Sequence, residues 1–179
     1  MRRAFLLIFA TLFFSGCMKF GSVFKSRTFE VNEGYLSIMQ INKNIQKQLP
    51  KVKKVGNNKV EIRTIYIFSS KDGKNLVAEL EFIFYSFEIP EGLPAVARVQ
   101  ADLVYDTKEQ EFRLGNIRDI EIKYLKESLL EYLSPNQEKF IKETIIEKLY
   151  EIILHKSKRR LKPLKSFEAK EGKIKVVFE

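Results

Sequence analysis

The sequence predicts an α+β fold in which a long, strongly coiled antiparallel sheet, built as a meander, wraps around a long helix. Apolar and polar residues alternate through four stretches, each about twice the usual strand length of about 5–6 residues. Tight turns separate these stretches, and long antiparallel strands twist strongly. A single coiled sheet has to bury one face, and amphipathic helices are available to fill it. The predicted strands are 59–70, 75–89, 95–105 and 111–123.

The first predicted helix covers residues 32–49. Asn32 is placed to cap its N-terminus, and Glu33 follows in the first turn, where a negative charge is favourable. Apolar residues recur along it at spacings of three and four, and Pro50 ends it. This broad apolar face is typical of a helix that packs on a core, and it is also suited to line a ligand cavity.

Turn chemistry separates the predicted strands. Asp72-Gly73 predicts a hairpin turn, because Gly supplies the positive φ angle that such a turn requires. The next breaks fall at Pro90 and at residues 107–110. In the fourth strand Asn116 interrupts the apolar face, which indicates a bulge or an edge.

The C-terminal third is predicted to be helical, with a final strand. Residues 124–133 have a helical pattern, and a new helix then begins with Ser134 as its cap and Gln137 completing a capping box. The apolar face of this helix continues to about Lys156. Residues 173–178 alternate again and predict a closing strand.

Composition limits the classes of function. The chain has 179 residues, of which 45% are hydrophobic, so it suits one folded domain and is not globally disordered. One Cys and one His exclude an internal disulfide and a zinc cluster of several such ligands. The formal net charge of +9 indicates an anionic partner. Its cations concentrate in residues 34–60 and 156–165, which contain no acidic residue.

The N-terminus has the layout of a secretory signal. Arg2 and Arg3 precede an apolar run that is too short to span a bilayer. The following Phe14-Ser15-Gly16-Cys17 resembles the bacterial lipobox, with Phe in the position that usually holds Leu. We therefore expect Cys17 to carry a lipid. The alternative is a signal anchor in which the Cys has no such role.

This motif predicts how the chain is divided and where it resides. Residues 1–16 are the expected lipoprotein signal peptide, residues 17–28 a lipid-anchored tether and residues 29–179 a single α+β, lipid-binding-like domain. Acyl chains such as palmitate on Cys17 would anchor the protein to a membrane. Met18 favours the outer membrane of a bacterial envelope, with the domain facing the periplasm. Export disfavours nucleic acid as a partner and favours anionic lipid head groups.

The segment 156–165 is the most strongly charged part of the sequence. We expect its cations to contact anionic lipid or lipopolysaccharide, at about 1 kcal/mol for each cation near a charged surface. A solvated helix end is the alternative. The candidate contact residues are Lys156, Lys158, Arg159, Arg160 and Lys162.

The order of these elements resembles the YceB-like family of periplasmic lipoproteins along essentially the whole mature chain. The resemblance implies a fold like that of the tubular lipid-binding (TULIP) superfamily, in which acyl chains lie between a coiled sheet and a helix. It rests on the order and spacing of four segments: residues 29–33 (Phe-Glu-Val-Asn-Glu), 59–68, 129–133 (Leu-Leu-Glu-Tyr-Leu) and 170–178.

The expected function is that of an envelope lipoprotein that binds a lipid or another hydrophobic ligand, in lipid transport or envelope maintenance. The alternative is a non-enzymatic structural protein that docks an envelope partner. We expect a monomer that needs no cofactor. Because such a cavity is defined by apolarity, the candidate lining residues are apolar ones: Leu36, Met39, Leu80, Phe82, Phe84, Phe112, Ile146 and Leu149.

No catalytic chemistry is expected. His155 has neither a free Cys nor a Gly-x-Ser-x-Gly elbow to act with, and we interpret it as a helix-end residue favoured by the helix dipole. Four acidic residues lack the spacing of a calcium loop, so no metal site is expected, and we interpret them as solvated turn residues. They are Asp102, Asp106, Glu109 and Glu111.

Overall fold

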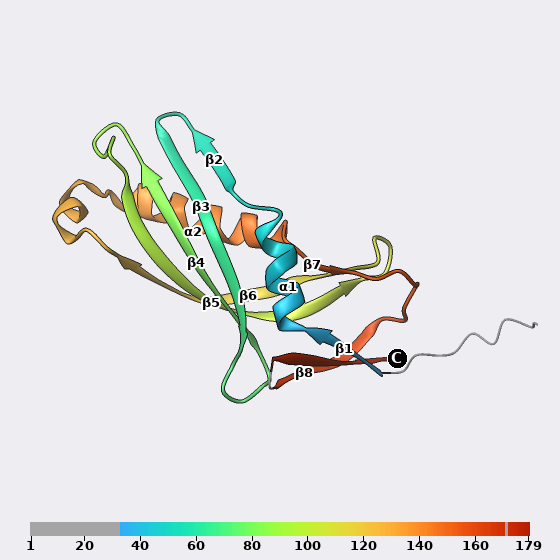
Figure 1. The fold of residues 1–179 in the computed structure, drawn as a ribbon. Coiled ribbons are helices and arrows are strands. Elements are labelled where there is room, and N and C mark those ends of the chain that lie inside the picture. The colour runs from blue at the N-terminus through green and yellow to red at the C-terminus, as the bar shows by residue number, and fades with distance from the viewer. Residues whose placement is uncertain (1–32, 171) are drawn as a thin grey trace, which may run out of the picture. The chain divides into compact units, whose positions relative to one another are not determined.

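The computed structural model describes residues 33–170 and 172–179 of the chain. These residues form two antiparallel sheets, two α-helices and a short 3-10 helix (Figure 1). In chain order the elements are β1 (Glu33–Ser37), α1 (Ile38–Gln46), β2 (Lys51–Val55), β3 (Asn58–Ser69), β4 (Leu76–Tyr85), β5 (Leu93–Asp106), β6 (Glu111–Tyr124), η1 (Glu127–Tyr132), α2 (Pro135–Tyr150), β7 (Ile153–Lys156), β8 (Leu164–Lys170) and β9 (Lys173–Phe178).

The larger sheet has the strand order β2-β3-β4-β5-β6-β7, and the smaller sheet has the order β1-β9-β8. Each strand of the larger sheet pairs with the next strand in the chain, and all of these pairings are antiparallel. Its two edge strands, β2 and β7, do not pair with each other, so the sheet is open and is not a closed barrel. The predicted α+β class, dominated by an antiparallel sheet, is confirmed.

The predicted hairpin turn joins β3 to β4. Gly73 has a φ angle of 70° there, as the Asp-Gly pair predicts. A Cβ atom on Gly73 would lie 2.9 Å from the backbone oxygen of Ala169 in β8. The Ala169 N–H also donates a hydrogen bond of 2.9 Å to the Gly73 oxygen. Glycine therefore lets this turn of the larger sheet touch the smaller sheet.

The predicted interruption of the fourth strand is a bulged region of β6. Asn116 and Asp119 have positive φ angles of 45° and 52°. The pairing of β5 with β6 shifts register twice between Arg98 and Asp102. An irregularity of this kind bends the strand and increases the local twist of the sheet.

One face of the meander is buried along its length. Alternate residues from Leu76 to Phe84 in β4 and from Leu93 to Leu103 in β5 are at most 3% exposed. The residues between them include exposed charges such as Glu79. The buried face joins the apolar residues of α1 and α2 in one hydrophobic cluster. Removing this apolar surface from water is the main stabilising contribution to the fold.

The predicted start of the first helix is wrong. Glu33 to Ser37 form β1, which pairs with β9, and α1 begins at Ile38. The cap is Ser37, whose hydroxyl accepts a hydrogen bond of 3.4 Å from the Gln40 N–H. Tertiary pairing with a strand far along the chain overrides the local helical pattern, because β9 offers backbone partners that a helix turn lacks.

The predicted end of the second long helix is also wrong. Its capping box at Ser134 and Gln137 is confirmed, but α2 ends at Tyr150. Residues Ile153–Lys156 form β7, which pairs with β6. The β-branched and apolar residues just before His155 suit a strand, and the open edge of β6 supplies their partners.

Smaller differences affect the connecting segments. β4 ends at Tyr85 rather than at residue 89, and residues 124–133 contain only the short η1 instead of a full helix. The short strands β2 and β8 are absent from the sequence-based prediction. They are too short and too rich in Lys and Ser to show an alternating apolar pattern.

Candidate functional site

Among the described residues, part of one edge of the larger sheet has no strand partner. β2 pairs only with the first half of β3, from Asn58 to Ile62. The backbone groups of the second half, including those of Ile65 and Ile67, have no strand beside them on that side in residues 33–170 and 172–179. Partly buried backbone N–H and C=O groups need other hydrogen-bond partners.

Side-chain amides of α1 supply these partners. The Asn42 amide donates to the Ile67 oxygen at 3.1 Å and accepts from the Ile67 N–H at 2.7 Å. The Gln46 amide donates to the Ile65 oxygen at 2.9 Å. Asn42 and Gln46 are four residues apart, so they lie on the same flank of the helix.

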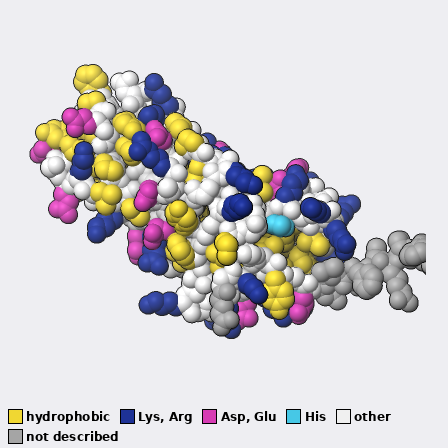
Figure 2. Space-filling model, in the orientation of Figure 1, with side chains coloured by type: hydrophobic (Ala, Val, Ile, Leu, Met, Phe, Trp, Pro, Cys, Tyr) yellow, Lys and Arg dark blue, Asp and Glu magenta, His cyan; other side chains and the backbone are white. Residues whose placement is uncertain are grey.

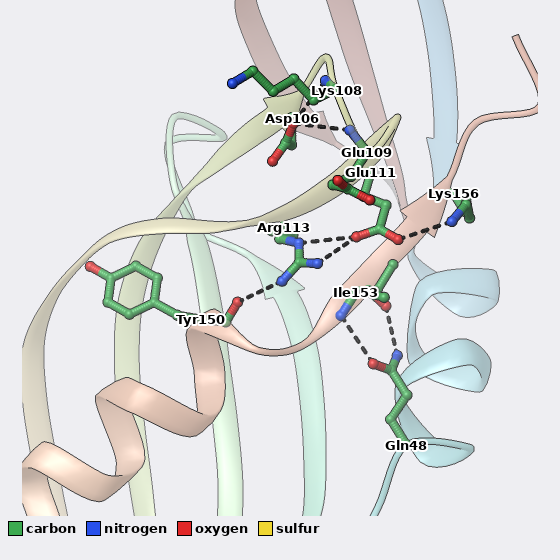
Figure 3. A network of polar contacts seen from close by, with 9 residues as sticks. All are labelled: Gln48, Asp106, Lys108, Glu109, Glu111, Arg113, Tyr150, Ile153 and Lys156. Carbon is green, nitrogen blue, oxygen red and sulfur yellow. Dashed lines mark hydrogen bonds and ion pairs between the residues drawn. The ribbon is translucent and has the colours of Figure 1, made fainter. Parts of the chain in front are cut away.

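The other flank of α1 makes equivalent bonds to β7. The Gln48 amide, just after the helix, donates to the Ile153 oxygen at 2.7 Å and accepts from the Ile153 N–H at 3.1 Å (Figure 3). The Asn44 amide donates to the Leu154 oxygen at 3.3 Å. α1 therefore bridges β3, the second strand of the larger sheet, and β7, the edge strand at its other end (Figure 1).

The sequence carries a sign of this bridge that the sequence-based prediction missed. Between the two amide flanks, α1 buries a stripe formed by Ile38, Ile41 and Ile45. An apolar stripe with amide pairs four residues apart on both sides suits a helix inserted between two strand edges. The amide residues are Gln40, Asn42, Asn44, Gln46 and Gln48.

The long helix α2 also packs across the larger sheet, in contact with β6 and β3. Two ion pairs connect it to the edge strand β2: Lys53 pairs with Glu147, and Lys51 lies 3.5 Å from Glu151. On the other side, the Arg113 guanidinium of β6 donates to the backbone carbonyl oxygen of Tyr150 at 3.3 Å (Figure 3). The buried face of α2 consists of Ile141, Thr144, Ile145 and Leu149.

Most of the predicted cavity residues lie in the interior beneath these two helices. Five of them are at most 1% exposed, and Leu36 is 8% exposed. Ile146 is partly buried. Met39 is 80% exposed, so its predicted place in a cavity is wrong; it lies on the solvent side of α1. The five fully buried candidates are Leu80, Phe82, Phe84, Phe112 and Leu149.

Besides Thr64 in β3, two buried hydroxyl groups lack hydrogen-bond partners among the described residues. They are the Thr144 hydroxyl, on a fully buried residue of α2, and the Tyr124 hydroxyl at the end of β6. Burial, followed by the charge of Glu138, raises the pKa of Tyr124 to about 12. A buried hydroxyl without a partner is unfavourable, so both groups could gain from a polar ligand atom.

A buried carboxylate holds β7 against β6 (Figure 3). Glu111 is 4% exposed, and its oxygens accept from the Arg113 Nε at 3.2 Å and from the Lys156 Nζ at 3.3 Å. Burial raises the pKa of Glu111, but the bonds from Arg113 and Lys156 outweigh burial, and the net pKa lies below its ordinary value of 4.5. The prediction that Glu111 is a solvated turn residue is therefore wrong.

We expect Glu111→Gln to destabilise the protein by about 1–3 kcal/mol at pH 7, because it leaves two cations without their shared carboxylate. A lowered carboxyl pKa stabilises the fold above the unfolded value, and this contribution is lost as the pH falls through the folded value. The difference from wild type should therefore shrink below pH 4.5, the ordinary value. Urea unfolding at pH 7 and at lower pH measures it. Exposed Glu143→Gln is the control, and a pH-independent difference for Glu111→Gln would contradict the assignment.

The remaining acidic candidates lie in different settings. Asp106 accepts from the N–H groups of Lys108 and Glu109 in the turn after β5, as a turn residue does (Figure 3). Asp102 instead pairs with Arg118 at 2.9 Å beside the β6 bulge. Within the described ranges, no three His, Cys, Asp or Glu side chains are placed to hold a metal ion.

The basic segment 156–165 connects β7 to β8, so its interpretation as a solvated helix end is wrong. The exposed Lys156 pairs with Glu111 at its start. The Leu161 N–H donates to the Tyr105 hydroxyl at 3.3 Å near its middle. These contacts fix a surface loop on which four further candidate cations are exposed: Lys158, Arg159, Arg160 and Lys162.

His155 lies in β7 rather than at a helix end. Its ring centroid is 6.1 Å from that of Phe112, and burial lowers its pKa. The only His of the chain is visible at the surface in Figure 2, close to several Lys and Arg side chains. Neutral imidazole suits a position beside an apolar ring and near cations.

A scan against protein-family models finds no match to the chain, and a search of the curated proteins finds none either. In the part of the chain that the structure describes, no helix has the length and apolarity needed to cross a membrane. The predicted signal peptide (residues 1–16), the lipidation site Cys17 and the tether (residues 17–28) lie outside the described residues.

Proposed function

We propose that the chain is a lipid-anchored protein of the bacterial envelope that holds a lipid or another hydrophobic ligand between its larger sheet and its helices. The observation that carries this proposal is the continuous buried apolar face of the sheet beneath α1 and α2. We propose that the sheet coils around its helices as in the TULIP superfamily. The resemblance to YceB-like lipoproteins would then reflect this shared fold.

The chemistry of the interior supports an amphiphilic ligand. Sites for small hydrophobic ligands are mostly apolar and contain a few polar groups that orient the ligand. The apolar side chains of the cluster suit an acyl chain. The unpaired hydroxyls of Thr144 and Tyr124 are polar groups within this apolar surrounding.

The N-terminal sequence motif supports the proposed location in the cell envelope. Lipidation at Cys17 would place the domain on the periplasmic side of the envelope, with Met18 favouring the outer membrane. Two or more acyl chains hold a protein on a membrane far more firmly than one chain. The exposed Lys158, Arg159 and Arg160 would then meet anionic head groups nearby. Such a protein would serve lipid transport or maintenance of the envelope.

A titration with a fluorescent fatty acid tests the proposal. The chain without residues 1–17 keeps every residue that the structure describes. After removal of bound lipid, it should bind the probe saturably and release it to unlabelled oleic acid. Ile146→Trp should weaken binding several-fold, because it fills space beside the buried face of α2. Lys142→Trp, on the exposed side of the same helix, is the matched control.

A second candidate function is the docking of an envelope protein, and one surface favours it. Large exposed apolar side chains are found in the β4–β5 turn and around η1, at the end of the unit where Figure 2 shows hydrophobic groups gathered. An apolar patch on a soluble surface often marks an interaction site. If this function is the main one, Phe87→Ser with Tyr132→Ser should abolish a crosslinked partner while no fatty acid binds. The patch includes Phe87, Leu125, Leu130 and Tyr132.

A further inference from the structure

The two helices that lie across the sheet are held in different ways. α1 is joined to β3 and β7 through amide groups that bond directly to the backbone, at distances of 2.7 to 3.3 Å. α2 meets the edge strand β2 through side chains alone in the contacts described above, namely the pairs Lys51–Glu151 and Lys53–Glu147. α1 is therefore anchored to the backbone of both strands, whereas side-chain ion pairs join α2 to β2 at the rim of the sheet.

The interior leaves little room for a ligand unless a covering element moves. The buried face of the sheet and the buried stripes of both helices belong to one packed cluster. The hollow that borders Phe82 has a volume of about 230 Å³, and its lining includes the exposed residues Arg63 and Glu81. Phe82 is the only one of the eight predicted cavity residues that lines this hollow. The hollow is therefore not the predicted ligand site in the interior.

Two observations favour α2 over α1 as the element that opens. Its pairs with β2 are solvent-accessible, with side-chain exposures of 29% for Lys53 and 44% for Glu147. Ion pairs at this exposure contribute little to stability. Its buried face also carries the unpaired hydroxyl of Thr144, which is unfavourable in the closed arrangement. Opening of α2 would let water form a hydrogen bond with this hydroxyl.

The charges at the rim indicate the kind of ligand. Lys53 pairs with Glu147 of α2, Lys51 pairs with Glu151 just after the helix, and the neighbouring Lys54 is exposed. No acidic residue occurs in the whole stretch 34–60. When α2 moves away, the carboxylate or phosphate of an amphiphile can take the place of Glu147 and Glu151.

We propose that a single-chain anionic amphiphile enters the interior between β2 and α2, through a gate formed by Lys51, Lys53, Glu147 and Glu151. This inference rests on the proposed function, because it describes the entrance to the same interior. The acyl chain passes beneath α2, and the anionic head remains at the lysines of β2. α1 stays in place, since its amides keep the backbone of β3 and β7 satisfied.

Stopped-flow release of a dansyl-labelled fatty acid from the chain lacking residues 1–17 tests the gate. Glu147→Lys places a third cation beside Lys53 and Lys148, which both pair with Glu147 in the wild type, and release should accelerate about five- to tenfold. The charge exchange Lys53→Glu with Glu147→Lys restores an attractive pair and should return release to within about twofold of wild type. Reversal of Glu143, which pairs with Lys139 on α2 and does not face β2, should leave release unchanged.

Hydrogen exchange gives a second readout that needs no ligand. The amides of α2 should exchange faster in Glu147→Lys than in wild type, while those of α1 remain unchanged. Probe binding with unaltered release and unaltered α2 exchange in Glu147→Lys would overturn the gate and leave the proposed function intact. Absence of probe binding to the folded wild-type chain would overturn both.

Competition by anionic and by neutral single-chain lipids identifies the preferred head group. Lauric acid and a lysophospholipid with an anionic head should compete with the dansyl probe, and a monoacylglycerol of the same chain length should compete more weakly. Lys53→Gln should reduce this preference for anionic heads, because it removes one of the cations that hold them. Equal competition by the neutral lipid would contradict the assigned role of the lysines.

Discussion

Replacement of Phe82 by alanine should lower the free energy of unfolding by about 3–5 kcal/mol. Phe82 is 1% exposed and lies in β4 on the face that both helices cover. Truncation removes apolar contacts and leaves a cavity that a rigid strand cannot close by relaxation. Urea unfolding followed by far-UV circular dichroism at neutral pH measures the difference.

Phe87 is the matched control for this prediction. It has the same side chain and lies shortly after the end of the same strand, but it is 80% exposed. Phe87→Ala should change the free energy of unfolding by no more than about 0.5 kcal/mol. Comparable losses in the two variants would mean that the β4 face is not the core of the unit.

Replacement of Asn42 by alanine should lower the free energy of unfolding by about 2 kcal/mol. The change removes both hydrogen bonds to the backbone of Ile67 and leaves its N–H and C=O groups without their partner on that side. Alanine is the better helix former, so helix propensity would act in the opposite direction. The same urea titration measures the loss.

Gln40 provides the control on the same helix. Its amide is exposed and bonds to the Asn44 side chain at 2.9 Å, so no strand backbone depends on it. Gln40→Ala should therefore change stability by no more than about 0.5 kcal/mol. If Asn42→Ala were as mild as Gln40→Ala, the bridging role of α1 would be wrong.

The long strands could be predicted because local residues determine them. In β4 and β5 the apolar face alternates without interruption, and Gly73 marks the turn that opens the hairpin. The bulge in β6 could also be located, since Asn116 interrupts an otherwise regular face. In each case the period of two and the turn residues contain the information.

Other elements depend on partners that are distant in the sequence. Glu33–Ser37 reads as a helix start, yet it forms β1 because β9 lies beside it. Ile153–Lys156 reads as the end of a helix, yet it forms β7 because β6 has an open edge there. A local pattern cannot show which strand edge will be free, so tertiary pairing decides these cases.

The candidate site was predictable in its apolar residues and not in its polar ones. Phe82 and Leu149 could be placed in the interior from the periodicity of β4 and α2, whereas Met39 has the same apolar character and lies on the outside of α1. The bonds from Asn42 to β3 and from Lys53 to α2 depend on how the elements meet in space. Sequence spacing gives the flank of a helix but does not identify its neighbour.

Native mass spectrometry tests ligand binding by the interior most directly. The chain lacking residues 1–17 is exported to the periplasm of a bacterial host and purified without detergent. We expect a complex with one amphiphile, whose mass, after release by organic solvent, identifies a fatty acid or a phospholipid derivative. We also expect the delipidated protein to take up oleic acid at one molecule per chain. A folded protein that carries no lipid, and that takes up none after delipidation, would show that the interior does not bind a hydrophobic ligand.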